Sequence, residues 1–382
     1  MVNSNTRTLG IIFPNSYDYF VPELVGLRLM ASIPFASRYR LIDFTLSSMV
    51  TSGISNVAVV VSNNYQSLID HLGSGRSWDL VRKNGGLNIF PPNAYSSSKP
   101  YVGRAGALAN ILDFLKKQKQ KYVLLANANI ASNFDFKAMV DAHVASGADV
   151  TLAYREQELP KGFVEAPDNV KGYYYTLRMD EDKRINKIYV NPKDKGIQNF
   201  HLNIMVISRE LLIDLVNEAS LLGKEYLERD VLLPKLNKLN VRGYKYDGYT
   251  ACITGLKSYF DENLKLIDEK NLNALFPKKN PVYTKIRDDN PTRYVTGSSV
   301  SNSLLADGCV IEGTVENCVL FRGVKVKKGA VVKNCVLMQD TVVEPGAELD
   351  CVVTDKNVRI TADKKLSGTK SFPVYVQKNH IV

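Results

Sequence analysis

The sequence lacks the features that mark membrane, disulfide-rich and zinc-binding proteins. No stretch of about 18 residues is both apolar and free of charge, so we expect no transmembrane helix and no membrane partner. The first residues, MVNSNTRTLGIIF, hold one basic residue and an apolar run too short for a signal peptide, so we expect a cytoplasmic protein. The five cysteines form no CxxC pair and the four histidines stand singly, which argues against a disulfide framework and a metal site.

Acidic residues are fewer than basic ones, but the excess of positive charge is spread along the chain. Lys and Arg number 49 against 39 for Asp and Glu, a formal net charge of +10. The densest basic runs, Lys116–Lys121 and Lys325–Lys328, have none of the interleaved arginines and aromatic residues of a nucleic-acid surface. We therefore expect solvated basic faces and anionic metabolites as ligands, with no nucleic-acid partner.

Residues 1–268 alternate short apolar runs with helical patterns. At roughly 150 residues per domain, the 382 residues correspond to two or three domains. The alternation of strand and helix predicts an α/β domain with a mixed, mostly parallel sheet covered by helices. The expected strands span residues 9–13, 57–61, 122–125, 149–153, 173–178 and 202–207, and the expected helices span 68–72, 105–115, 136–144, 210–217, 229–239 and 256–268.

The C-terminal part follows a different pattern. Residues 269–296 contain three prolines among polar residues, so we expect a linker there. Over residues 297–382 an apolar residue recurs every five or six positions, which indicates the hexapeptide repeat of a parallel β-helix. The near-constant repeat length argues against the alternative, a β-sandwich. Because a β-helix has open ends, we expect oligomerisation through this domain.

A longer repeat is superposed on the hexapeptides. Asn317-Cys318-Val319-Leu320 returns as Asn334-Cys335-Val336-Leu337 and then as Asp350-Cys351-Val352-Val353. We therefore expect one small buried cysteine stacked per coil, with glycines at the corners where the backbone needs an unusual φ.

The segment Arg28–Phe44 (RLMASIPFASRYRLIDF) resembles the N-terminal block of the bacterial ADP-glucose pyrophosphorylases, the glucose-1-phosphate adenylyltransferases. The resemblance continues into Leu46-Ser47, Ser52-Gly53-Ile54 and Trp78-Asp79-Leu80, and the order of elements extends it over nearly the whole chain. It implies a Rossmann-like nucleotidyltransferase domain followed by a left-handed parallel β-helix. Members of this family use Mg²⁺ to transfer AMP from ATP to glucose 1-phosphate, releasing pyrophosphate, in bacterial glycogen biosynthesis.

The two positions that hold the magnesium ion in this family carry no carboxylate here. Asn127-Ala128-Asn129 stands where the family has Gly-Asp-His, so Ala128 replaces the first aspartate. Residues 248–254 align with the motif GYWRDIG, and Cys252 replaces the second aspartate. Since a methyl group cannot bind a metal and a thiol is a poor ligand for Mg²⁺, the resemblance implies that no metal is retained.

The phosphate-binding segments of the family have changed as well. Residues 14–24 hold no glycine, although the family places a glycine-rich loop there, and their large aromatic side chains would obstruct a backbone cradle for a triphosphate. Gly106 stands where an aspartate is usual. Val190 and Asn191 replace the glutamate and the lysine of the sugar-phosphate site.

These losses resemble the GlgD-type regulatory subunits of the family. The resemblance then implies a chain that is inactive or nearly so, and that supports the catalytic subunit of ADP-glucose pyrophosphorylase in a hetero- or homo-tetramer. The alternative is an active adenylyltransferase with relocated metal and phosphate ligands. An acyltransferase of the β-helix type is disfavoured, because its histidine base would lie on the solenoid and His380 is outside the repeats.

Three arginines are candidates for a residual anion or effector site. Arg38 and Arg40 lie in the retained block, and Arg229 takes the place of a lysine of the family. Arg38 and Arg40 could hold a phosphate or carboxylate through two parallel hydrogen bonds, and Arg229 could contact a phosphate. The structural alternatives are a pair between Arg40 and Asp43 and a helix-terminal ion pair for Arg229. His71 is expected to be a hydrogen-bonded structural residue.

Overall fold

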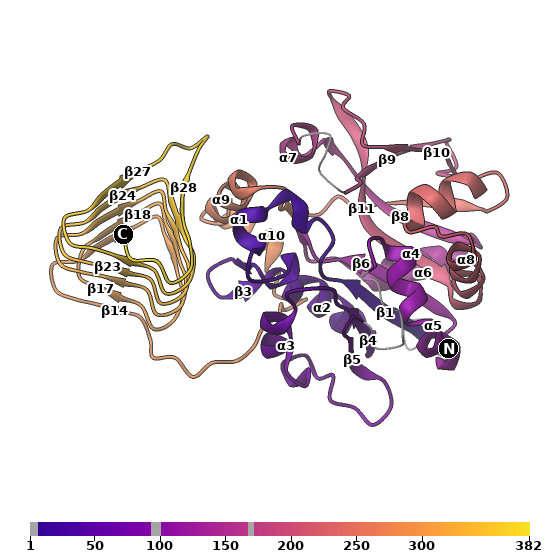
Figure 1. Cartoon of the computed structure of the whole chain (residues 1–382), viewed down its shortest axis with the longest axis horizontal. Coiled ribbons are helices and arrows are strands. Elements are labelled where there is room, and N and C mark those ends of the chain that lie inside the picture. Colours follow the sequence, from indigo (N-terminus) through magenta and orange to yellow (C-terminus); the bar gives the residue numbers. More distant parts are fainter. Residues whose placement is uncertain (1–6, 93–100, 167–171) are drawn as a thin grey trace.

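The computed structural model describes residues 7–92, 101–166 and 172–382, which form two parts side by side (Figure 1). The first part is a layered α/β structure, and the second is a stack of triangular coils that ends at the C-terminus. The predicted order of an α/β domain and a β-helix is confirmed.

A nine-stranded mixed sheet forms the centre of the first part. Its strands are β1 (Thr8–Phe13), β4 (Asn56–Val60), β5 (Gly86–Phe90), β6 (Tyr122–Asn127), β8 (Val150–Glu158), β9 (Tyr175–Met179), β10 (Ile185–Val190), β11 (Ile197–Ser208) and β12 (Val241–Lys245). The main path runs β10-β9-β11-β6-β1-β4-β5, with β8 and β12 attached through β11. β1 is parallel to β4 and β6, whereas β11 is antiparallel to β6 and β8. Two short pairs accompany the sheet: β2 (Pro34–Phe35) with β3 (Tyr39–Arg40), and β7 (Ile130–Ala131) with β13 (Ala251–Cys252).

Helices cover this sheet (Figure 1). They are α1 (Pro22–Val25), α2 (Leu41–Thr51), α3 (Gln66–Leu72), α4 (Arg104–Asn110), α5 (Leu112–Lys117), α6 (Phe136–Ser146), α7 (Lys161–Val164), α8 (Arg209–Leu221), α9 (Leu256–Lys265) and α10 (Glu269–Leu275). Short turns of 3₁₀-helix lie at η2 (Asp18–Phe20), η3 (Met30–Ser32), η4 (Arg76–Trp78) and η6 (Leu233–Lys235), and one turn of π-helix lies at η5 (Leu227–Leu232).

Two of the predicted helices were wrong in detail. The helix expected over 105–115 is divided into α4 and α5, because Ile111 leaves the helical region with φ −112° and ψ 18°. The helix expected over 229–239 is replaced by η5 and η6, which meet beside Pro234. Proline has no backbone N–H to donate and its ring clashes with the preceding turn, so an α-helix does not continue through this position.

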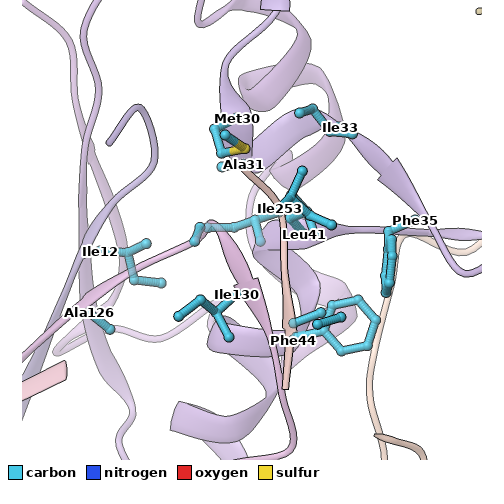
Figure 2. Packing of buried hydrophobic residues seen from close by; sticks show 14 of the residues in the cluster. Ile12, Met30, Ala31, Ile33, Phe35, Leu41, Phe44, Ala126, Ile130 and Ile253 are labelled. Carbon is cyan, nitrogen blue, oxygen red and sulfur yellow. The ribbon is translucent and has the colours of Figure 1, made fainter. Parts of the chain in front are cut away.

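Alternation along the central strands produces two separate cores. Ile12 of β1 points to one face of the sheet and packs with the residues of η3 and α2, while its neighbours Ile11 and Phe13 point to the other face, towards α4, α5 and α8. Figure 2 shows part of the first core, where Ile12 and Ala126 of the sheet gather with other apolar side chains. Burial on both faces explains why these strands read as continuous apolar runs.

The second part consists of three parallel five-stranded sheets, the arrangement of a left-handed β-helix. The sheets are β14-β17-β20-β23-β26, β15-β18-β21-β24-β27 and β16-β19-β22-β25-β28. Their strands are β14 (Arg293–Tyr294), β15 (Ser299–Ser301), β16 (Leu304–Leu305), β17 (Val310–Ile311), β18 (Thr314–Glu316), β19 (Val319–Leu320), β20 (Lys325–Val326), β21 (Val331–Lys333), β22 (Val336–Leu337), β23 (Val342–Val343), β24 (Glu348–Asp350), β25 (Val352–Thr354), β26 (Arg359–Ile360), β27 (Lys365–Ser367) and β28 (Val374–Val376). Apolar side chains from all three sheets fill the interior.

The register of the coils corrects the predicted repeat by one residue. Val319 pairs with Val336, so Cys318 and Cys335 occupy the same buried position, as expected. Val336 then pairs with Val353, however, which places Cys351 next in the row after Asn334 instead of after Cys335. The stack of cysteines therefore ends after two coils. The backbone register between coils, and not the similarity of the four-residue motifs, sets which residues lie in one row.

A ladder of asparagines runs along one corner of the β-helix. Asn302, Asn317 and Asn334 all have positive φ, of 41°, 53° and 49°. The amide of Asn302 donates to Asn317 (2.6 Å) and that of Asn334 to Asp350 (2.8 Å). Asparagine tolerates the left-handed backbone conformation that these corners require, and its side-chain amide donates a hydrogen bond to the corner residue of the next coil.

The segment 269–296, expected as a linker, holds α10 at its start and β14 at its end. Its proline-rich middle crosses from the sheet to the first coil (Figure 1). Within the described residues, every helix is too short or too polar to cross a membrane.

Candidate functional site

A cleft of about 670 Å³ opens where the parallel strands β1, β4 and β6 end. Such carboxyl ends of parallel strands are the usual place for a ligand in an open α/β sheet. Phe13, Ser62 and Asn127 line the cleft at these three strand ends. The remaining lining comes from Asn15–Tyr19, Pro22, Val25, Gly26, Asn63, Asn64, Tyr101–Arg104, Gly172, Tyr173, Tyr175, Asn203, Tyr226 and Glu228.

Ala128 and Cys252, at which the resemblance places the metal ligands of the family, offer no hard ligand. Ala128 is buried between β6 and β7, and Cys252 lies in β13, which pairs with β7. The amide of Asn129 lies 4.0 Å from the Cys252 sulfur. Burial raises the pKa of the Cys252 thiol well above its ordinary value, so this group is a neutral thiol at pH 7.

Aromatic packing holds the loop that follows β1. Tyr17 adopts a left-handed conformation (φ 72°), and its hydroxyl donates to the backbone oxygen of Tyr173 (2.7 Å). Its ring lies 5.0 Å from Phe163 and 5.8 Å from Phe20. Aromatic packing thus fixes the loop after β1, and this loop lines the cleft with side chains. The family is expected to have a glycine-rich loop at the same place, whose backbone would face the ligand.

The space beside Gly106 is already occupied by a carboxylate. A Cβ added at Gly106 would meet Oε2 of Glu225 at 2.1 Å, and the backbone oxygen of Glu225 accepts a hydrogen bond from Ala105 (2.9 Å). An aspartate at position 106 would therefore need Glu225 to move. Sequence comparison with the family showed the missing aspartate but not the residue that fills its place.

Asn191 makes a turn and does not extend into the cleft. Its backbone is left-handed (φ 48°), its Oδ1 accepts from the Tyr174 N–H (2.9 Å), and its amide donates to the Gly172 carbonyl (3.3 Å). Val190, the last residue of β10, packs against the second core. Neither of these two residues lines the cleft.

A buried polar cluster at the base of the cleft went unnoticed in the sequence. Arg104 and Glu228 form an ion pair (3.0 Å), and both side chains are less than one tenth exposed. Nε2 of His201 lies 4.0 Å from the same carboxylate, while its Nδ1 donates to the Ala153 carbonyl (2.8 Å). Burial lowers the pKa of His201 to about 4, so its ring is neutral. The only sequence signal was a charged residue directly before each of the two expected helices at 105–115 and 229–239.

The three candidate arginines lie in three different surroundings. Arg38 pairs with Asp307 of the β-helix, and Arg229 pairs with Asp230 (2.5 Å). Arg40 donates to the carbonyl (2.5 Å) and hydroxyl (3.0 Å) of Ser67. Of the two alternatives left open for Arg229, the structure forms the ion pair, whereas a side-chain pair of Arg40 with Asp43 is not formed.

Asp43 has other partners. Its Oδ2 accepts from the backbone N–H of Arg40 (3.0 Å), which caps α2, and its Oδ1 lies 2.6 Å from Nε2 of His71. The predicted structural role of His71 is confirmed by this buried contact.

The two parts of the chain are joined by a buried ion pair. Nη2 of Arg28 lies 2.7 Å from Oδ1 of Asp355, and both side chains are 4% exposed. The Tyr375 hydroxyl donates to the other oxygen of Asp355 (2.9 Å). Beside this pair, burial and the positive charges of Arg40 and Arg28 lower the pKa of Lys356 to about 7.

Comparisons with known proteins agree with this architecture. A family model described as nucleotidyl transferase matches residues 30–189, and one described as GlmU-like, C-terminal hexapeptide, matches residues 286–369. The chain is 34% identical over 374 residues to the glycogen biosynthesis protein GlgD of Bacillus subtilis, covering 98% of this chain and 96% of that protein. It is 36% identical over 379 residues to GlgD of Geobacillus stearothermophilus, covering 99% and 98%. The glucose-1-phosphate adenylyltransferase of Geobacillus stearothermophilus is 32% identical over 309 residues, covering 79% and 76%.

Proposed function

We propose that this chain, which belongs to the family of the GlgD glycogen biosynthesis proteins and the glucose-1-phosphate adenylyltransferases, is a non-catalytic or very weakly active regulatory subunit of ADP-glucose pyrophosphorylase. Its partner would be the catalytic subunit, which makes ADP-glucose and pyrophosphate from ATP and glucose 1-phosphate. The chain would support that reaction in bacterial glycogen biosynthesis.

The observation that carries the proposal is the chemistry of the former metal and phosphate positions. Ala128 and Cys252 offer a methyl group and a neutral thiol, and Asn191 is engaged in a backbone turn. Metal and preorganised charges provide the largest share of catalysis in phosphoryl transfer. A cleft without them has lost the means to stabilise the charge that develops on the phosphates.

The alternative, an active enzyme with relocated ligands, would have to use the carboxylates that remain in the cleft. Glu228 is neutralised by Arg104. Asp18 accepts a hydrogen bond from the Met30 N–H (2.8 Å), and burial raises its pKa to about 7, so much of it is protonated at neutral pH. These two carboxyls support the non-catalytic proposal over the alternative.

Two assays test the regulatory proposal. The purified chain alone, with ATP, Mg²⁺ and glucose 1-phosphate, is expected to form little or no ADP-glucose. The adenylyltransferase of the same organism, co-purified with this chain, is expected to show a higher rate or a changed effector response. Turnover by the chain alone at the rate of the catalytic subunit would establish the alternative instead, and a partner unaffected by the chain would contradict regulation.

We also propose that the β-helix takes part in assembly of a tetramer. Its last coil exposes apolar side chains, since Phe372 is 83% and Ile381 71% exposed. Apolar residues at the end of a solenoid favour contact with another chain. Light scattering of the chain alone and with the catalytic subunit measures the assembly, and a monomer under both conditions would contradict it.

An anionic effector is proposed at the boundary between the two parts, beside Arg40 and Lys356. Arg38 and Arg229 already have carboxylate partners, whereas Arg40 has only the neutral Ser67 as a side-chain partner among the described residues. Burial, and after it the positive charges of Arg40 and Arg28, lowers the pKa of Lys356, and an anion beside these groups would offset part of their charge. A sugar bisphosphate is expected to raise the melting temperature of the chain, and Arg40→Gln to abolish the rise, with Arg229→Gln as the control. Equal responses of both variants would exclude this location.

A further inference from the structure

We propose that Asn84 is a site of spontaneous modification, at which the backbone nitrogen of Gly85 closes a succinimide ring that water then opens to aspartate or isoaspartate. Asn84 lies in the loop between η4 and β5, and this loop does not line the cleft. The inference concerns the chemistry of the isolated chain and is independent of any effect on a partner subunit.

The reaction needs only the two neighbouring residues and water. The backbone nitrogen of Gly85 attacks Cγ of Asn84, so that a C–N bond forms and closes a five-membered ring. The side-chain amide nitrogen leaves as ammonia, together with the proton that the Gly85 nitrogen loses. Water then breaks one of the two bonds of the ring nitrogen. Cleavage at Cγ gives aspartate, and cleavage at the main-chain carbonyl gives isoaspartate, in which the main chain runs through the former side chain. No group is oxidised or reduced.

The sequence makes Asn84 distinct, because it is the one asparagine of the chain that a glycine follows. A side chain on the following residue hinders the approach of its nitrogen to Cγ, and glycine has none. The fold also requires glycine at position 85. Its φ is 85°, and a Cβ there would lie 3.2 Å from Cβ of Asn56. The reactive pair is therefore a consequence of how the chain turns into β5.

Both reacting groups are free of hydrogen bonds within the described part of the chain. The side chain of Asn84 is exposed, and residues 83–85 bend without a hydrogen-bonded turn. The N–H of Gly85 has no acceptor there, whereas the N–H of Gly86 donates to the Ser55 carbonyl (2.8 Å). No hydrogen bond therefore has to break before the ring closes.

Asn379 shows the opposite situation and serves as an internal comparison. Its Oδ1 accepts a hydrogen bond from Nδ2 of Asn357 (3.1 Å). The N–H of the following residue, His380, donates to the Gln377 carbonyl (3.3 Å). Electrophile and nucleophile are both engaged, and the following residue carries a side chain. The structure therefore favours modification at Asn84 over modification at Asn379.

Modification changes the charge and the backbone at the entrance to an edge strand. A neutral amide becomes a carboxylate, next in sequence to Arg82 and Lys83. Isoaspartate also lengthens the main chain shortly before Gly86, which has a φ of 83° and has no room for a Cβ beside the Leu80 carbonyl. Among the described strands, β5 pairs only with β4. We therefore expect isoaspartate to loosen β5 locally.

Peptide mapping of the full chain by mass spectrometry tests the proposal. The chain is incubated at mildly alkaline pH, folded in one sample and unfolded in urea in another. The folded chain is expected to gain aspartate and isoaspartate at position 84 at a rate within several-fold of that in urea, while position 379 stays unmodified. Hydroxylamine, which cleaves succinimides, is expected to cut the folded chain between residues 84 and 85.

Three variants connect the products to the site and to β5. Asn84→Gln is expected to abolish them, since its longer side chain does not form the five-membered ring. Asn379→Gln is the matched control and should leave modification at position 84 unchanged. Hydrogen exchange over residues 86–90 is expected to be several-fold faster in the isoaspartate-containing chain than in fresh protein. Asn84→Asp adds the charge without lengthening the main chain and should change this exchange less.

Two results would overturn the site. The first is a folded chain in which position 84 stays unmodified over the time that converts it in urea. The second is equal conversion of positions 84 and 379 in the folded chain. Unchanged exchange of residues 86–90 in the modified chain would overturn the loosening of β5. None of these results bears on the regulation of a partner subunit, so the two proposals fail separately.

Discussion

At the scale of the residue, two positions that differ from the pattern expected for the family make structural contacts. Asn191 forms a left-handed turn that its amide completes, and Gly106 allows Glu225 to approach α4. At Gly106, the aspartate expected in the family would meet the side chain of Glu225.

We predict that Gly106→Asp destabilises the chain. The new Cβ would lie 2.1 Å from Oε2 of Glu225, and the two carboxylates would repel each other. Overpacking of this kind lowers the free energy of unfolding by about 1–3 kcal/mol. In urea denaturation, Gly106→Asp combined with Glu225→Ala is expected to be more stable than the sum of the single changes. Strictly additive effects would show that Glu225 does not oppose an aspartate here.

At the scale of the element, the β-helix is defined by its coil length and its corners. The corner row of Asn302, Asn317, Asn334 and Cys351 keeps a positive φ in each of four coils. The residue type changes at the last member, but the backbone conformation does not. Register in the stacked coils therefore follows the backbone geometry of the corners together with the buried rows of valine and leucine.

We predict that Asn334→Ala costs more stability than Asn334→Gly. Both changes remove the hydrogen bond to Asp350, but only alanine opposes the left-handed conformation, by about 1–2 kcal/mol. Urea denaturation followed by circular dichroism measures the difference. Equal stabilities of the two variants would mean that the positive φ at this corner carries no cost.

At the scale of the whole molecule, the buried pair Arg28–Asp355 fixes the β-helix against the α/β part. The residues are 327 positions apart in the sequence, and both are almost fully buried. A buried pair is costly to break from one side, because the remaining charge stays out of water. The orientation of the two parts therefore depends on this contact.

We predict that Arg28→Met or Asp355→Leu alone lowers the free energy of unfolding by about 3–5 kcal/mol, as for other broken buried pairs. The double variant is expected to recover most of the loss, since it leaves no unpaired charge. Arg38→Met, which removes a half-exposed pair with Asp307, serves as the control and should cost only about 0–1 kcal/mol. A double variant as unstable as the singles would mean that packing, not charge, holds the two parts together.

We predict that the chain becomes more stable as the pH rises from 7 towards 10.5, through Lys356. Its pKa is about 7 in the folded protein against 10.5 ordinarily, so the unfolded chain binds more protons over this interval. The groups that set this pKa, after burial, are Arg40, Arg28, Asp355 and Lys378. Lys356→Met should therefore stabilise the protein most below pH 7 and lose this advantage at high pH. Thermal melts from pH 6 to 10 measure the effect, with exposed Lys270→Met as the control; parallel curves for both variants would contradict it.

Much of the candidate site was predictable because it depends on residue identity. The missing carboxylates at Ala128 and Cys252 and the absence of glycine from the loop after β1 are visible in the sequence alone. The partners that now satisfy these positions were not predictable. Glu225 beside Gly106 and Glu228 beside Arg104 meet only after distant helices pack.

The succession of an α/β part and a β-helix follows from the order of amino acids alone, because apolar periodicity indicates which side chains each local element can bury. The same order also determines which chemical groups remain for catalysis. Three features became visible only in the folded chain: Cys351 follows Asn334 in the corner row, Arg40 donates to Ser67, and Arg28 pairs with Asp355. These outcomes depend on contacts between residues far apart in the chain, and such contacts are selected by shape and burial once the elements assemble.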